Sequence, residues 1–149
     1  MSPSKYCGFL LVLSMLSLAA RATNNEVIGF VKHAQGDATV TTDLQPLKAK
    51  PGTPLYLGSV LKTGDGGSLG VTFRDNTMMS FGPDTEVTID EYLYQPAKGH
   101  LKLAASLVRG TLHYISGVIA KLKPEAVSIN TSTGIIGVRG TRFAVKAEN

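Results

Sequence analysis

Residues 69–81 read Leu69-Gly-Val-Thr-Phe-Arg-Asp-Asn-Thr-Met-Met-Ser-Phe81, two short runs that flank an Asp-Asn pair. In the first run the apolar side chains Leu69, Val71 and Phe73 alternate with small or polar residues. A period of two places the apolar residues on one face of a β-strand. Asn tolerates the positive φ that tight hairpin turns require. The stretch therefore predicts two antiparallel strands joined by a turn at Asp75 and Asn76.

The same alternation recurs along most of the chain, with turn residues about every 8–12 residues, a spacing typical of all-β domains. No window outside the N-terminal segment has helical periodicity. Glycine-containing turns at 36–37 and 64–67 are expected to close hairpins, whereas residues 43–54, which hold three prolines, are expected to form a loop. The sequence predicts one all-β domain of short antiparallel strands, either a β-sandwich or a β-roll of solenoid-like form. Phe73 and Phe143 are both expected in its core.

The N-terminal segment has the layout of a secretory signal peptide. Lys5 precedes an apolar run at 6–20, and Ala20-Arg21-Ala22 offers a cleavage site after Ala22. The run is shorter than the roughly 20 residues that span a bilayer. We expect residues 1–22 to be removed, which leaves 23–149 as a single β domain in the bacterial periplasm without a membrane span. The alternative is an uncleaved segment that anchors the domain to the inner membrane.

Charge and cysteine content narrow the classes of partner. The formal net charge is +4, and loss of Lys5 and Arg21 with the signal peptide lowers it by two, to +2. The remaining lysines are scattered among acids, whereas a nucleic-acid protein typically concentrates them on one face. Cys7 is the only cysteine and lies in the segment expected to be removed. We expect no nucleic-acid partner and no disulfide.

No motif in the chain points to a metal, a cofactor or a nucleophile. The three histidines lie far apart in sequence, without the spacing of metal ligands. Asp84, Glu86 and Asp90 could form the paired acids of a small glycan hydrolase or the sugar contacts of a lectin. Acids on the solvated face of a β-domain are the simpler interpretation. We therefore expect no enzyme activity, no cofactor and no metal site, and we keep the glycan-binding or hydrolase function as the alternative.

Several motifs occur in an order that resembles the FecR-domain family. They are a Gly-hydrophobic-Thr-Gly turn at 58–68, the strand–turn–strand at 69–83 and the segment Val138-Arg-Gly-Thr-Arg-Phe-Ala-Val145. The resemblance covers residues 55–145. It marks nine residues as family-signature positions with structural roles: Gly64, Asp65, Asp75, Pro83, Val138, Arg139, Gly140, Thr141 and Phe143. Arg139 is expected to tie strands together, because a guanidinium presents five donors in a fixed geometry.

The resemblance implies a binding or scaffolding module, or an accessory to signalling, in the bacterial cell envelope. The iron-uptake regulators of the family carry a cytoplasmic segment and a membrane helix, and neither is expected in this chain. Members usually continue into a further hairpin after the Arg-Gly-Thr segment. We therefore expect an open edge near residues 142–146, which could accept a strand from another envelope protein or from a second copy of the chain.

Overall fold

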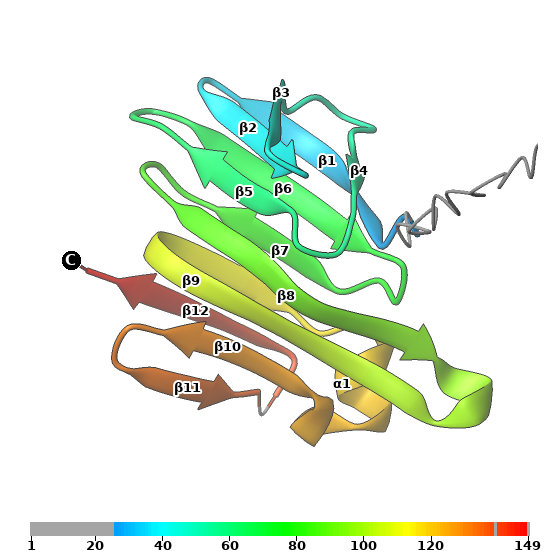
Figure 1. The fold of residues 1–149 in the computed structure, drawn as a ribbon. Coiled ribbons are helices and arrows are strands. Elements are labelled where there is room, and N and C mark those ends of the chain that lie inside the picture. Colours follow the sequence, from blue (N-terminus) through cyan, green and yellow to red (C-terminus); the bar gives the residue numbers. More distant parts are fainter. Residues whose placement is uncertain (1–25, 139, 149) are drawn as a thin grey trace, which may run out of the picture.

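The computed structural model describes residues 26–138 and 140–148, which form one curled sheet of twelve strands (Figure 1). The all-β prediction is confirmed. The strands are β1 (Gly29–Gln35), β2 (Ala38–Thr42), β3 (Gln45–Lys48), β4 (Pro54–Leu55), β5 (Val60–Thr63), β6 (Ser68–Phe73), β7 (Met78–Phe81), β8 (Glu86–Gln95), β9 (His100–Ile115), β10 (Val127–Thr131), β11 (Gly134–Gly137) and β12 (Arg142–Ala147). Helical turns are η1 (Pro96–Lys98), α1 (Val118–Leu122) and η2 (Pro124–Ala126).

The sheet folds over itself into two layers that share strand β9. Layer 1 has the order β4-β1-β6-β7-β9-β12, and layer 2 has the order β3-β2-β5-β8-β9-β10-β11. Residues 100–109 of β9 pair with β8 in layer 2, whereas residues 110–115 pair with β12 in layer 1. Every pairing is antiparallel except that of β9 with β10. The strand that belongs to both layers therefore connects them covalently and by hydrogen bonds.

The glycine-rich turns are corners between the layers. The predictions of hairpins at 36–37 and 64–67 were wrong, because β1 does not pair with β2, nor β5 with β6. The backbone instead turns from one layer into the other, with positive φ at Gly36 and Gly66. Successive corners hydrogen-bond to one another: Gly64 N–H donates to Asp37 C=O at 2.9 Å, and Asp84 N–H donates to Gly64 C=O at 3.1 Å. This stacking of corners is the arrangement of a roll.

The turn predicted at Asp75 and Asn76 is confirmed as a hairpin between β6 and β7. Leu69 pairs with Phe81, and Asn76 has a φ of 66°. The prediction of a loop at residues 43–54 was wrong in part. Its residues include β3, which pairs with β2 through a two-residue turn that has positive φ at Asp43 and Leu44. β3 is an edge strand, so Pro46, which has no backbone N–H, removes no hydrogen bond from the ladder.

The core lies between the two layers and uses the apolar positions that the alternation predicted. Burial alternates along β6, and Phe73 is buried there with an exposed fraction of 2%. Its ring stacks on Tyr92 of the other layer, with 5.4 Å between ring centroids. Phe143 is only half-buried and packs at the edge of the core, so its expected place inside the core was wrong.

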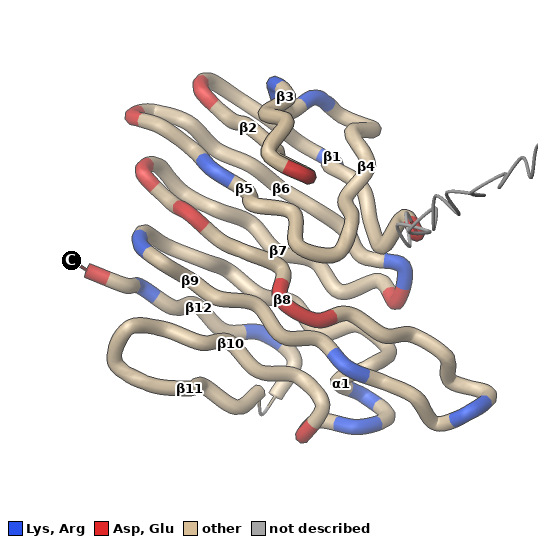
Figure 2. The backbone as a smooth tube through the Cα atoms, in the orientation of Figure 1, with Lys and Arg blue, Asp and Glu red and all other residues tan. Residues whose placement is uncertain are grey.

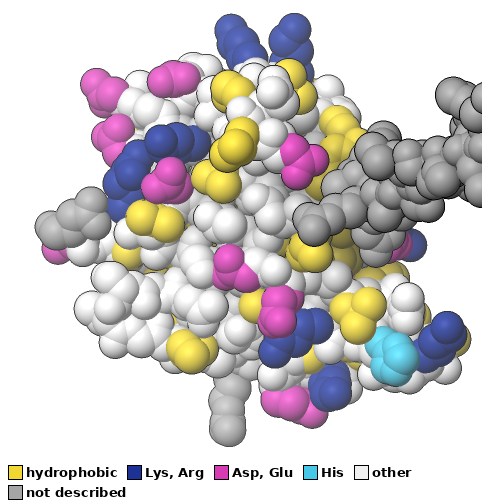
Figure 3. All heavy atoms as spheres, viewed as in Figure 1, with side chains coloured by type: hydrophobic (Ala, Val, Ile, Leu, Met, Phe, Trp, Pro, Cys, Tyr) yellow, Lys and Arg dark blue, Asp and Glu magenta, His cyan; other side chains and the backbone are white. Residues whose placement is uncertain are grey.

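The surface carries mixed charge and separate apolar spots. Basic and acidic residues are both spread over the tube in Figure 2. On the face shown in Figure 3, hydrophobic side chains form several small patches. Over the described part of the chain, no helix has the length and apolar character needed to cross a membrane.

Candidate functional site

Asp75 is a fully buried acid that joins three parts of the fold. Its Oδ1 accepts a hydrogen bond from the Tyr92 hydroxyl at 2.9 Å, and its Oδ2 accepts bonds from Thr77 Oγ1 at 2.6 Å and Ile119 N–H at 3.1 Å. The backbone carbonyl of Asp75 also accepts the N–H of Val118, at the start of α1. A buried carboxylate persists where such donors surround it. The signature residue Asp75 therefore has a structural role.

Two tyrosines near this acid, the half-buried Tyr92 and the buried Tyr114, hold their protons strongly. Burial raises the pKa of Tyr92 far above its usual value, and the negative charge of Asp75 raises it further. Burial likewise raises the pKa of Tyr114. Neither phenol is available as a base or nucleophile near neutral pH. Both rings serve packing, and the Tyr92 hydroxyl also serves hydrogen bonding.

We expect stability to fall as the pH rises above about 10, the usual tyrosine pKa. In that range the unfolded chain loses the phenolic protons while the folded protein keeps them, so the folded state binds more protons and unfolding becomes more favourable. Urea unfolding at about pH 9 and pH 11 measures the loss. A Tyr92→Phe variant should show a smaller loss, and an equal loss in both proteins would contradict this origin.

Three signature residues lie at the corners of the roll. Gly64, Asp65 and Pro83 occupy the turns after β5 and β7. A Cβ on Gly64 would lie 3.0 Å from the carboxyl carbon of Asp37, so a side chain there would displace the side chain of Asp37. Asp65 and Pro83 are exposed. These positions support the fold and form no cavity.

The other signature residues form the connection from β11 to β12. Val138 is buried, and Gly140 has a φ of 103°. Ser116 holds this connection: its hydroxyl donates to Gly140 C=O at 2.9 Å, and its N–H donates to Thr141 C=O at 2.8 Å. The ring of Phe143 stacks on Tyr114 with 4.7 Å between centroids. The predicted role of Arg139 falls outside the described residues.

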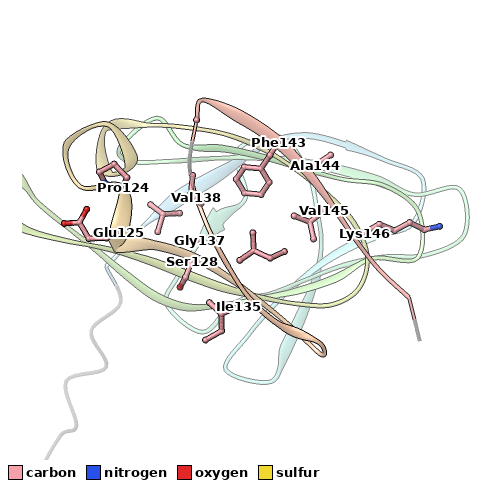
Figure 4. Close-up of a pocket in the computed structure, with 13 residues that line it drawn as sticks. Pro124, Glu125, Ser128, Ile135, Gly137, Val138, Phe143, Ala144, Val145 and Lys146 are labelled. Carbon is pink, nitrogen blue, oxygen red and sulfur yellow. The ribbon is translucent and has the colours of Figure 1, made fainter.

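An apolar groove of about 1350 Å³ opens beside this connection, between β12 and the β10–β11 hairpin (Figure 4). Val138, Phe143 and Val145 point into it from the connection and β12, and Ile136 lines it from β11. A smaller cavity of about 390 Å³ shares Ile136 and Val145 with it and continues toward Glu148. The groove lies where the two layers end, and none of the described strands closes the space between them.

One backbone edge of β12 is free among the described residues. β12 pairs with β9 and with no other described strand. Because the N–H of Ser116 bonds to Thr141 and antiparallel bonding alternates along a ladder, Phe143 and Val145 form their backbone bonds with β9. The N–H and C=O groups of the alternate residues therefore point away from β9; these residues are Arg142, Ala144 and Lys146. The edge that the sequence predicted is confirmed, but sequence analysis missed the groove beside it.

The side chains on the outer face of this edge are charged. Arg142 and Lys146 are exposed, and the Lys146 ammonium lies 2.6 Å from a carboxylate oxygen of Glu148. Their hydrogen bond raises the pKa of Lys146 and lowers that of Glu148. The edge thus combines an apolar face toward the groove with an ionic face toward solvent.

The acids considered for glycan chemistry lie on or next to β8, away from this groove. Asp84 is exposed at a corner with a φ of 51°. Glu86 is neutralised by Lys62 at 3.4 Å and by Arg109 at 3.2 Å, and Asp90 accepts a hydrogen bond from Ser106. None of the three acids lines the groove. Glu86 serves cross-strand pairing, which leaves it poorly placed to act as a catalytic acid or base.

The described residues contain no group of three or more His, Asp or Glu side chains that could hold a metal ion. His113 is exposed on β9, between the buried residues Leu112 and Tyr114. The groove beside β12 has mainly apolar walls and free backbone groups, a lining suited to a polypeptide.

The comparisons with known proteins place the chain in a family. A solved structure described as a cell surface anchoring domain is 33% identical, over 42% of this chain and 84% of that chain, with a TM-score of 0.40. No curated protein matches the chain. The family model described as "FecR protein" matches residues 59–149. The match covers more than half of the sequence and contains the corner, hairpin and β11–β12 positions described above, and so the chain belongs to the FecR family.

Proposed function

We propose that this protein is a non-enzymatic binding and scaffolding module of the bacterial cell envelope. It acts by adding an extended segment of another polypeptide to the free edge of β12. The groove carries this proposal, because apolar walls and unpaired backbone groups occur together there. Strand addition of this kind takes affinity from backbone hydrogen bonds and specificity from alternate side chains.

Export to the periplasm is part of the same proposal. The signal-peptide pattern at 1–22 supports it, as does membership in a family that includes envelope regulators. A role as an accessory to signalling is consistent with a module that recognises a strand of another envelope protein.

Site-specific photocrosslinking in cells tests the proposed docking edge. A photoreactive amino acid at Ala144, on the outward edge of β12, should give one discrete protein adduct in the envelope fraction. The same amino acid at Ser80 serves as the control. Ser80 is also exposed, but it lies on β7 within layer 1. Mass spectrometry should map the adduct to an extended segment of the captured chain.

The adduct should weaken when Val145 is replaced by Asp, because the charge would enter the apolar groove. Circular dichroism shows whether this variant keeps its β-structure. Absence of an adduct at Ala144, or equal adducts at Ala144 and Ser80, would overturn the proposed function.

A further inference from the structure

We propose that the strand bound at β12 belongs to a second copy of this chain, so that two molecules pair their β12 strands antiparallel about a twofold axis at Val145. This inference rests on the proposed function and names its partner. The argument comes from the direction of the free backbone groups and from the order of charges along the edge.

The backbone pattern restricts how two β12 strands can meet. The backbone N–H and C=O groups that point away from β9 belong to Arg142, Ala144 and Lys146. The same alternation continues to Glu148. A twofold axis at Val145 places Arg142 opposite Glu148 of the second copy and Ala144 opposite its Lys146. Each of these pairs joins two residues with outward N–H and C=O groups, so their backbones can form ladder hydrogen bonds.

The charges favour this register over its neighbours. With the axis at Val145, Arg142 and Glu148 of opposite copies form two cross-strand ion pairs on the solvent face. An axis at Ala144 would place Arg142 opposite Lys146, and like charges directly opposite one another are destabilising. An axis at Phe143 would leave Arg142 and Glu148 without a cross-strand partner of opposite charge. Among the registers centred on Phe143, Ala144 and Val145, the one centred on Val145 has the greatest charge complementarity.

The same register joins the two apolar faces. Val145 lies opposite Val145 of the second copy, and Phe143 lies opposite Ala147, with all of these side chains on the groove side of the strand. Ile135, exposed to 75% at the rim of the groove, gains a surface to cover it. Proteins often use a lysine to keep an edge strand from pairing. Here the Lys146 ammonium is already paired with Glu148 at 2.6 Å, which weakens that protection.

Charge exchange provides the test, because both residues are exposed and their replacement leaves the core unchanged. Sedimentation equilibrium of the protein without residues 1–22 should show a dimer at micromolar concentrations. Arg142→Glu and Glu148→Arg should each weaken dimerisation by about tenfold or more, because each places like charges opposite one another twice. The double variant should return to within about threefold of the native dissociation constant.

An Ala144→Pro variant removes an outward N–H without removing a bond to β9, and it should be monomeric with an unchanged circular dichroism spectrum. A native protein that is monomeric at high concentration would overturn the inference, and so would a double variant that remains as weak as the single variants. If photocrosslinking at Ala144 then captures a different envelope protein, the proposed docking edge stands and only self-pairing fails.

Discussion

Replacing Asp75 by Ala is expected to lower the free energy of unfolding by about 3–5 kcal/mol. The change leaves the Tyr92 hydroxyl, Thr77 Oγ1 and the Ile119 N–H without their acceptor in a site closed to water. A buried donor without a partner costs about 1–3 kcal/mol, and more than one is created here. Loss of the bond to Ile119 also removes one of the two hydrogen bonds that hold the start of α1, and the bond from Val118 N–H to the backbone carbonyl remains.

Urea unfolding followed by circular dichroism measures this loss. Asp65→Ala is the matched control, because Asp65 is exposed at a corner, and its replacement should change stability by less than about 0.5 kcal/mol. Asp75→Asn should fall between the two, because the amide keeps one acceptor oxygen but presents a donor where the second oxygen was. A loss in Asp75→Ala no larger than in Asp65→Ala would show that the acid does not organise the core.

Gly110→Ala is expected to cost a comparable amount, about 2–5 kcal/mol, for a steric reason. Gly110 has a φ of 92° at the point where β9 passes from one layer to the other. A Cβ there would lie 2.5 Å from the Cα of Thr85 and still closer to its hydroxyl. A side chain at positive φ costs about 1–2 kcal/mol, and forcing extra atoms into a packed site adds about 1–3 kcal/mol.

Gly99→Ala separates these two contributions. Gly99 has a φ of 67° in the turn before β9, and an added Cβ would meet nothing within 4 Å. This control should therefore lose only the conformational part, about 1–2 kcal/mol. Equal losses in both variants, measured by urea unfolding, would mean that the corner can relax away from Thr85.

Local patterns in the sequence predicted the strands well because alternation depends on burial of one face. Phe73 and Val71 show this directly, since their burial follows the period of two. β3 was missed because its turn places Asp43 and Leu44 at positive φ, which a leucine rarely adopts. Glycine at a turn predicts positive φ but not whether the strands on either side will pair, so corners were mistaken for hairpins.

The groove depends on relations that no local pattern contains. Val145 and Phe143 alternate like core residues, but whether a strand covers them is determined by the neighbours of β12 in the folded sheet. Asp75 likewise appeared as an ordinary turn residue, because its partners at Tyr92 and Ile119 are distant in sequence. The edge itself was predicted from the family resemblance, and only the structure shows which backbone groups face outward.

The position of β9 in both layers also has a consequence for the order in which the chain can fold. β7 and β8 precede β9, and each needs it as a hydrogen-bonded neighbour, one in each layer. As the chain is synthesised from its N-terminus, both layers therefore remain unfinished until the segment at 100–115 is available. That one strand then completes two ladders and offers an edge to β10 and to β12. Completion of both layers thus waits for residues 100–115.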